Sequence, residues 1–466
     1  MPAAVNSPAM SQFSEPQSIA PVSGKMSQAD LGKLIDDGAW STRQKFFLFL
    51  VGSAIIFDGF DNQVLGLAAP AIIRDWGVSK EMLAPILAIG QFGMLLGTAF
   101  GGALGDRFGR KIALLFSVLV FGLATTAMAA ADNITTLGIL RLIAGVGLGG
   151  ALPNAAAYIS EYTPLRSRSF AVTASIVCVP LGGVFGGLIA AQLLPVTGWR
   201  SLFLVAGCLP VILALLLWVL LPESGRFVLS RHGDSPQLRT VLRKAGIVAP
   251  ASVKLVDMAS GEAATKAPIR QILSSSLRRD TFLLWTAFGF CLMGIYAGFS
   301  WLPTMLSESG FGLAASSRGL MAFNLGGVFT ALFSAWMIAF MGSRLPMVTM
   351  AVLGAISAIA IYLFPLSPDQ PQIVTILVLA LLGGFVNGVQ TTLYALAAHI
   401  YPVSARATGV GAASSVGRIG AITSSFAGAS ILTSLGSGGF YILMTISMVV
   451  TAAALMAIKR HVVSVA

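Results

Sequence analysis

Long apolar runs constrain this chain more than any other feature. A helix that crosses a bilayer needs about 20 largely apolar residues, and the sequence contains twelve such runs. They occupy residues 45–73, 82–104, 112–131, 135–158, 170–193, 199–221, 281–305, 317–340, 346–365, 372–398, 407–431 and 438–458. Because 56% of the residues are hydrophobic and only 10% are charged, a soluble globular protein is excluded. We predict an all-α membrane protein with twelve transmembrane helices.

A long polar stretch divides these runs into two groups of six. The predicted organisation is a disordered tail at 1–42, a six-helix bundle at 43–221, a linker at 222–280 and a second six-helix bundle at 281–460. The tail is rich in Ser, Pro, Ala and Gln and has no apolar core. That composition is typical of disorder and not of a signal peptide.

Basic residues lie mostly on one side of the predicted membrane. With the amino terminus inside, the inner segments hold 23 of the 29 lysines and arginines, and the outer loops hold four. Because loops rich in Lys and Arg stay in the cytoplasm, both termini are expected to be cytoplasmic. The net charge of +11 does not indicate nucleic-acid binding, which needs basic residues gathered on one soluble face.

The two groups of runs share a faint internal repeat. Glu161 stands three residues before a proline and seven before Arg168, and His399 stands at the same distances from a proline and Arg406. Both patterns follow the fourth run of their group, which predicts two bundles related by pseudo-two-fold symmetry. The four residues lie at cytoplasmic helix ends, where charge pairs can form in one transport state and break in another.

Two aspartates interrupt the first apolar run. Asp58 and Asp61 are three residues apart, which places both on one face of a helix. A charged side chain at mid-bilayer depth costs about 3 kcal/mol on insertion scales, so such residues face a protein interior or a water-filled path. Two carboxylates held close together resist ionising at once, so one of them can carry a proton. The alternative is a structural, hydrogen-bonded pair.

Two arginines also lie within predicted spans. Arg418 follows Arg406, at the cytoplasmic end of its helix, by twelve residues, which places it about 18 Å into the membrane. Its planar guanidinium suits a carboxylate, so an anionic substrate is a natural partner. A permanent ion pair with Asp58 or Asp61 is the alternative. Arg141, nearer the outer end of its helix, fits proton transfer and helix packing equally well.

Amides and aromatic side chains at interior depth are further candidates for a substrate site. Asn154, Asn324 and Gln390 could each bind a ring hydroxyl or simply bridge two helices. Tyr394 and Phe323 lie close to these amides in the sequence and could stack on an aromatic ring.

Nothing in the sequence indicates an enzyme. Cys178, Cys208 and Cys291 all lie inside apolar runs, which does not fit a disulfide or metal framework. The sequence has no HExxH or GxSxG motif, no Cys–His pair and no nucleotide-binding loop. We expect no catalytic residue, no metal and no cofactor.

The segment between the second and third runs carries the most specific motif. Residues 102–111 read Gly-Ala-Leu-Gly-Asp-Arg-Phe-Gly-Arg-Lys, and this segment resembles the loop motif of the major facilitator superfamily. Residues 141–149 and 222–226 resemble two further motifs of that family. The resemblance implies the major facilitator fold. The candidate gating residues in the loop are Asp106, Arg107, Gly109 and Arg110.

Several further stretches narrow the resemblance to one group within that superfamily. The Asp-Gly-Phe-Asp motif and residues 152–154, 160–164, 301–304 and 405–409 resemble the bacterial aromatic acid:proton symporters, which include 4-hydroxybenzoate and protocatechuate carriers. The resemblance implies functional roles for Asp58, Asp61, Arg406 and Arg418. One departure is visible, because residues 340–344 lack the acid that the family usually has after its eighth helix. The second bundle is therefore expected to hold its gate differently.

The sequence as a whole predicts a proton-coupled importer of an aromatic carboxylate such as a hydroxybenzoate. It would work by alternating access, as a monomer in a bacterial cytoplasmic membrane, with the carboxylate, protons and the lipid bilayer as its partners. Alternatives are a carrier of a sugar acid or dicarboxylate, a drug:proton antiporter, which Arg418 disfavours, and a membrane receptor for aromatic acids.

Overall fold

The computed structural model describes residues 28–250, 253–257, 268–402 and 405–462, which are mostly helical. The elements are β1 (Gln28–Asp30), α1 (Leu31–Asp36), α2 (Thr42–Trp76), α3 (Lys80–Phe108), α4 (Arg110–Met128), α5 (Ile134–Tyr162), α6 (Leu165–Val196), α7 (Gly198–Leu220), α8 (Gly225–His232), α9 (Pro236–Lys244), β2 (Lys254–Val256), α10 (Pro268–Ile272), α11 (Arg278–Glu308), α12 (Leu313–Met341), α13 (Arg344–Leu363), α14 (Gln372–Ile400) and α15 (Arg406–Ala457). Long helices coincide with the apolar runs, because within a bilayer a single segment can satisfy its backbone hydrogen bonds only as a helix.

The described residues contain eleven helices that are long and apolar enough to cross a membrane. The last of them, α15, has 52 residues and would be about 78 Å long if it were continuous, roughly twice what a bilayer requires. Its backbone leaves the helical conformation at Gly436, where φ is 65°. A positive φ suits glycine, which has no Cβ to clash with the backbone. Counted as two legs, α15 brings the spans to the predicted twelve.

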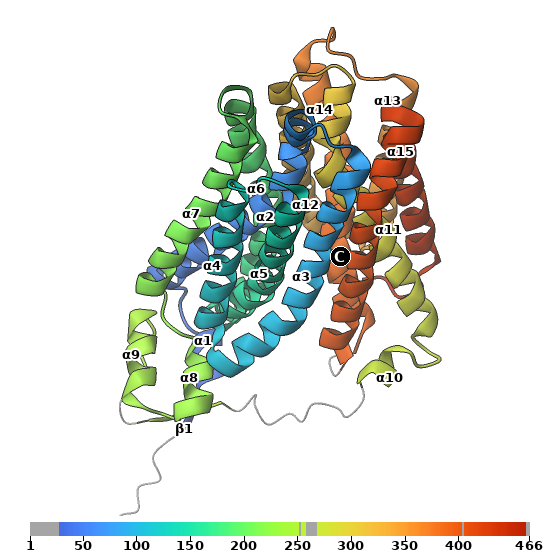
Figure 1. Ribbon diagram of the computed structural model, residues 1–466. Coiled ribbons are helices and arrows are strands. Elements are labelled where there is room, and N and C mark those ends of the chain that lie inside the picture. Colours follow the sequence, from blue (N-terminus) through green and yellow to red (C-terminus); the bar gives the residue numbers. More distant parts are fainter. Residues whose placement is uncertain (1–27, 251–252, 258–267, 403–404, 463–466) are drawn as a thin grey trace, which may run out of the picture.

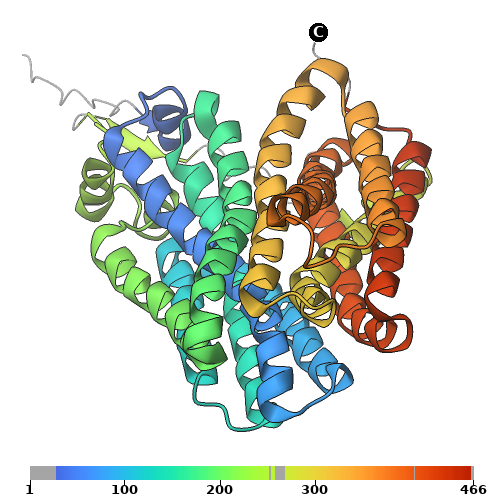
Figure 2. The same ribbon diagram turned by 90° about the horizontal axis from the view of Figure 1, so that it is seen from above.

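The helices form two bundles, α2–α7 and α11–α15, which lie side by side when the molecule is viewed from above (Figure 2). Glycines bring helix backbones into contact at matching places in the two bundles. A Cβ on Gly97 of α3 would lie 2.0 Å from the Val146 carbonyl oxygen on α5. A Cβ on Gly326 of α12 would lie 1.8 Å from the Ala380 oxygen on α14. Small residues permit such close helix packing in membranes, and the correspondence agrees with the predicted repeat.

Part of the predicted tail is structured. β1 pairs in parallel with β2 of the linker, Asp36 of α1 forms an ion pair with Arg168 of α6, and the Ser41 hydroxyl donates to the Ala245 carbonyl at 2.8 Å. Local composition could not reveal this arrangement, because the partners lie far along the chain. Residues 1–27 of the predicted tail lie outside the described residues. We call the end that carries β1, α1 and α8–α10, at the bottom of Figure 1, the linker end.

The two bundles are joined at the opposite end, which we call the far end. Lys80 of α3 forms an ion pair with Glu308 of α11 at 2.6 Å, and the Thr433 hydroxyl of α15 donates to Glu81. A Cβ on Gly66 of α2 would lie 2.1 Å from the Phe299 carbonyl oxygen on α11, so these two helices touch directly. This conformation is therefore closed at the far end.

Candidate functional site

The Asp-Gly-Phe-Asp motif of α2 is held in place by direct backbone contact with α6. A Cβ on Gly59 would lie 2.1 Å from the Val179 carbonyl oxygen, and a Cβ on Gly182 would lie 2.1 Å from the Ile56 carbonyl oxygen. Two glycines facing each other's helix therefore set the distance between α2 and α6. As a result, the aspartates on either side of Gly59 have fixed positions inside the molecule.

Asp61 is fully paired within the first bundle. Arg141 of α5 donates from Nη1 to Asp61 Oδ1 at 3.0 Å, and neither side chain is more than 2% exposed. The Thr125 hydroxyl of α4 donates to the same carboxylate. Arg141 also donates to the backbone oxygens of Asp61 and Asn62, each at 3.2 Å. The sequence left two roles open for Arg141, and the structure makes it the counter-charge of Asp61.

Asp58 has a different environment, although it lies only one turn away. It is 3% exposed and makes no side-chain hydrogen bond with any residue that the structure describes, which leaves Oδ1 buried without a partner there. A buried carboxylate without donors is costly when it is ionised, and protonation removes that cost. Asp58 is therefore the better candidate of the two to carry a proton.

Arg418 of α15 lies across the bundle interface from α2 and α3. Its Nη1 donates to the Tyr296 hydroxyl of α11 at 2.6 Å and to Gln91 Oε1 of α3 at 3.2 Å. Among the described residues it forms no ion pair with a carboxylate, so the bridge to Asp58 or Asp61 that the sequence left open is not made in this conformation. Because its hydrogen bonds to the described part of the chain all use Nη1, its Nη2 and Nε donors are available to an anion.

Two amides complete a closed ring of hydrogen bonds around Arg418. Gln91 donates to Asn62 Oδ1 at 3.2 Å, and Asn62 donates to the Tyr296 hydroxyl at 3.2 Å. The ring Arg418–Gln91–Asn62–Tyr296 therefore links α2, α3, α11 and α15. Sequence reasoning did not assign Asn62 or Gln91 to the site. The available signal was that both are polar side chains at mid-span depth, and that Asn62 directly follows Asp61.

A second amide contact also joins the bundles. Asn324 donates to Gln63 Oε1 at 2.8 Å and accepts from Gln63 Nε2 at 3.2 Å, with both side chains fully buried. Asn324 also donates to the Leu320 carbonyl oxygen. Of the predicted substrate residues, Asn324 is therefore committed to a contact between α2 and α12.

The other predicted substrate residues have varied surroundings. Phe323 is fully buried, edge-on to Phe299 at 6.2 Å between ring centroids. Tyr394 is half-buried, packs edge-on against Phe288 and has its hydroxyl 3.5 Å from Ser414 Oγ. Gln390, one turn before Tyr394 on α14, is also half-buried. Tyr394 and Gln390 are thus the partly accessible members of the set.

Asn154 is placed apart from the ring around Arg418. Its amide donates to the Gly101 and Gly150 carbonyl oxygens, each at 2.8 Å. A Cβ on Gly105 would lie 2.1 Å from Asn154 Oδ1 and 2.7 Å from Arg110 Nη1. Asn154 therefore lies in the contact between α3 and α5, beside the loop motif and near the linker end.

The loop motif forms a network within the first bundle. Arg110 forms ion pairs with Asp106 at 2.6 Å and Glu161 at 3.6 Å, and the Ser224 hydroxyl donates to Glu161. Gly109 has a φ of 104°, and a Cβ there would lie 2.3 Å from Glu223 Oε2, so two independent constraints require glycine. The Arg107 carbonyl oxygen accepts from Arg231 at 2.8 Å.

The predicted gate pairs have other partners in this conformation. Glu161 contacts Arg110, and Arg168 contacts Asp36. His399 and Arg406 are exposed at the linker end. In the second bundle, the loop that lacks an acid bonds to the carboxyl-terminal segment, because the Ser343 N–H donates to the Val462 oxygen at 3.0 Å and Ser343 Oγ accepts from the Val462 N–H at 2.9 Å.

Comparison with known proteins identifies the family. Residues 51–425 match the family described as Major Facilitator Superfamily. The chain belongs to the Major Facilitator Superfamily. The partially occluded, inward open xylose transporter XylE from E. coli has the same fold, with a TM-score of 0.68, 17% identity, and coverage of 90% of this chain and 99% of that one. These findings confirm the predicted fold and identify a transporter, not an enzyme.

Relatives within this superfamily carry aromatic acids. The 4-hydroxybenzoate transporter PcaK of Acinetobacter baylyi is 37% identical over 93% of this chain and 94% of that protein. The gallate transporter of Pseudomonas putida is 36% identical over 88% of this chain and 90% of that protein. The gentisate transporter of Corynebacterium glutamicum is 30% identical over 87% and 85% of the two chains. They confirm the predicted resemblance.

Proposed function

We propose that the chain is a proton-coupled importer of an aromatic carboxylate, working by alternating access. One observation carries this proposal. Within the described structure, Asp58 is a buried carboxylate without a hydrogen bond and Arg418 is a guanidinium with unused donors, and the two lie on opposite sides of one bundle interface. The first group suits a proton and the second suits an organic anion. The relatives that transport hydroxybenzoate, gallate and gentisate support an aromatic ring on that anion.

In this mechanism the substrate carboxylate binds Arg418 through Nη2 and Nε as a two-point contact. The Tyr296 hydroxyl already accepts from Arg418 and Asn62, so its own proton is free to donate to the anion. The ring then lies near the half-buried Tyr394, whose edge-on contact with Phe288 fixes its orientation. Gln390, half-buried one turn before Tyr394 on α14, would bind a ring hydroxyl.

Coupling follows from the charge on Asp58. When Asp58 is ionised, it competes with the substrate anion for Arg418, and when it is protonated, it leaves the arginine to the substrate. Asp61 does not compete, because Arg141 and Thr125 satisfy it. One proton moving with one monoanion is electroneutral, so each unit of inward pH gradient supports about tenfold accumulation.

The excess of Lys and Arg at the linker end orients that end toward the cytoplasm. The conformation closed at the far end would then be the one that exposes the site to the cell interior. The relatives are bacterial proteins, and we place this chain in a bacterial cytoplasmic membrane as a monomer.

Uptake into liposomes tests the proposal. Purified protein would be reconstituted and offered labelled benzoate, 4-hydroxybenzoate, protocatechuate and gentisate, with and without an inward proton gradient. We expect protein-dependent accumulation that collapses when a protonophore is added. Binding of these acids without uptake would contradict transport and would favour a receptor. Uptake of a sugar acid or dicarboxylate alone would contradict the aromatic assignment.

A further inference from the structure

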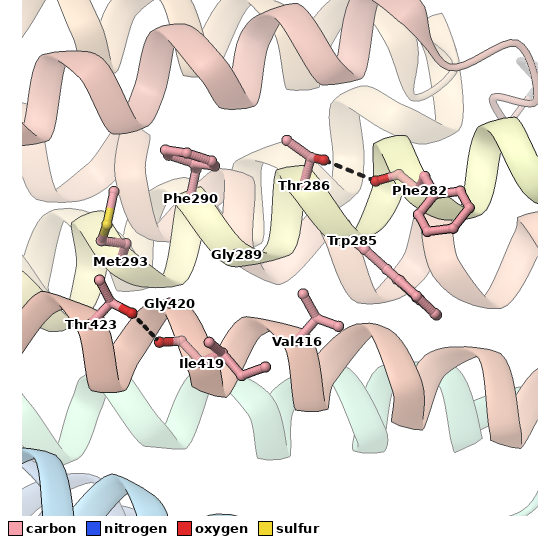
Figure 3. A pocket seen from close by; sticks show the side chains of 10 residues that line it. All are labelled: Phe282, Trp285, Thr286, Gly289, Phe290, Met293, Val416, Ile419, Gly420 and Thr423. Carbon is pink, nitrogen blue, oxygen red and sulfur yellow. Dashed lines mark hydrogen bonds between the residues drawn. The ribbon is translucent and has the colours of Figure 1, made fainter.

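A groove runs along the outside of the second bundle, between α11 and α15. Its walls are Phe282, Trp285, Phe290 and Met293 of α11 with Ile419 and Thr423 of α15 (Figure 3), and its volume is about 320 Å³. Thr286 and Thr423 donate their hydroxyl protons to backbone oxygens one turn earlier in their own helices, at 3.0 and 2.9 Å. The groove therefore presents an apolar lining.

The groove faces away from the interior of the molecule. Phe282 is 51% exposed and Ile419 is 58% exposed, and the lower part of α11 lies at the edge of the second bundle in Figure 1. Large exposed apolar side chains on a membrane-spanning helix are matched by lipid chains and not by water. Neither Arg418 nor Tyr296 lines the groove, so it is distinct from the central site.

A cation stands at the linker end of the groove. Arg278, Phe282, Trp285, Gly289 and Met293 are spaced four, three, four and four residues apart, which places them in one stripe along α11. The Arg278 side chain is exposed and makes no hydrogen bond or ion pair with the part of the chain that the structure describes. The apolar groove therefore ends at a positive charge that has no partner among the described residues.

The surroundings of Arg278 add further positive charge. Arg279 donates to the Ala457 carbonyl oxygen at 3.1 Å, and Lys459 and Arg460 follow the same end of α15. The nearby acid, Asp280, is buried, accepts from the Lys459 N–H and lies 3.9 Å from Arg460. This end of the groove is thus complementary to an anion at the level of the lipid headgroups.

We propose that the groove binds one anionic phospholipid, with an acyl chain between α11 and α15 and the headgroup phosphate at Arg278. The floor of the groove has room for the acyl chain at Gly289, because a Cβ there meets nothing closer than Val416 Cγ1 at 4.0 Å. One turn along α15, the backbones touch, since a Cβ on Gly420 would lie 1.9 Å from the Gly289 carbonyl oxygen. The acyl chain fills the groove where α11 and α15 move apart on one side of that contact.

Native mass spectrometry of the full chain tests the headgroup. The protein would be extracted from vesicles of equal parts dioleoylphosphatidylglycerol and dioleoylphosphatidylcholine, and the retained lipid identified. We expect phosphatidylglycerol to be retained, and Arg278→Gln to lower the ratio of retained phosphatidylglycerol to phosphatidylcholine about fivefold. Arg166→Gln is the matched control, because Arg166 is also exposed at the linker end but lies on the first bundle. Equal ratios in the two variants would overturn the proposal.

A size series at Gly289 tests the groove itself. Gly289→Ala leaves most of the slot open and should retain the lipid, whereas Gly289→Leu fills it and should abolish retention of both lipids. Lipid retained by Gly289→Leu as by the unaltered protein would overturn the proposal, because the acyl chain would then bind elsewhere. If Gly289→Leu does not fold, the comparison of Arg278→Gln with Arg166→Gln still tests the proposal.

Discussion

At the scale of single residues, two aspartates share one motif but differ in their surroundings. Asp61 is satisfied by Arg141 and Thr125, whereas the side chain of Asp58 has no hydrogen bond to the described residues. The cost of a charge at mid-bilayer depth predicted that both carboxylates lie inside the molecule, and their spacing predicted that they share one helix face. It could not distinguish them, because the partners of Asp61 are 64 and 80 residues away and reach it only through the packing of α4 and α5.

The two aspartates should therefore differ in their effect on stability. Asp61→Asn leaves the buried Arg141 without its counter-charge, which should lower the free energy of unfolding by about 3–5 kcal/mol. Asp58→Asn removes no hydrogen bond and should change it by less than about 1 kcal/mol. Thermal unfolding in detergent would measure both. Equal losses in the two variants would contradict the assignment of Arg141 as the partner of Asp61. Adding Arg141→Gln to Asp61→Asn removes the unpaired charge and should recover part of the lost stability.

Arg418 should matter for its shape as well as its charge. Arg418→Lys keeps the cation but loses the planar fork that contacts a carboxylate at two points. Losing one charge-assisted hydrogen bond should raise KM for the substrate about 10- to 100-fold. Initial uptake rates over a range of substrate concentrations would show it. Arg318→Lys, at a surface arginine bonded to Gln372, is the control that should leave KM unchanged. An unaltered KM in Arg418→Lys would count against a direct substrate contact.

At the scale of elements, glycine contacts set the distances between helices. Gly59 and Gly182 bring α2 onto α6, and Gly97 and Gly326 bring together equivalent helix pairs in the two bundles. The sequence placed glycines in these helices but could not show which ones face a neighbouring backbone, because that depends on the rotation of each helix about its axis.

Gly59 should not tolerate even one methyl group. Gly59→Ala would push α2 away from the Val179 carbonyl and move Asp58, at a cost of about 1–3 kcal/mol and with loss of proton-driven uptake. Gly102→Ala is the control, because a Cβ at Gly102 has no atom within 4 Å. Uptake assays and thermal unfolding would compare the two variants. Normal uptake by Gly59→Ala would show that the position of Asp58 does not depend on this contact.

The loop after α7 should make stability depend on pH. Burial raises the pKa of Glu223 above its ordinary value, although its Oε1 accepts from the Lys111 and Ser224 N–H groups at 3.0 and 2.8 Å. A raised pKa favours the protonated, folded form, so this contribution is complete below the ordinary pKa of about 4.3 and is lost as pH rises through the folded pKa. In thermal unfolding, Glu223→Gln should therefore gain stability relative to the unaltered protein as pH rises from about 4.3 through the folded pKa of Glu223. A pH-independent difference would contradict this account.

At the scale of the whole molecule, the twelve spans and two bundles could be predicted because hydropathy and length are local properties. The contacts that join the bundles could not, because Asn62–Tyr296 and Gln63–Asn324 each connect residues more than two hundred positions apart. The same reason explains the tail, whose strand β1 pairs with β2 in the linker. The resemblance to aromatic acid symporters pointed to Asp58, Asp61 and Arg418. The structure adds the partners of Asp61 and Arg418 and shows that Asp58 Oδ1 is buried without one.

The central claim is that Asp58 carries the coupling proton while Arg418 holds the anion. The reconstituted Asp58→Asn variant measures this most directly, compared with Asp75→Asn, a control at an exposed aspartate on the same helix. Loaded liposomes would be assayed for exchange of labelled substrate without a gradient, and then for accumulation under an inward pH gradient of one unit. We predict that Asp58→Asn exchanges substrate but does not accumulate it, while Asp75→Asn accumulates it about tenfold. Accumulation by Asp58→Asn equal to that of the control would contradict the claim.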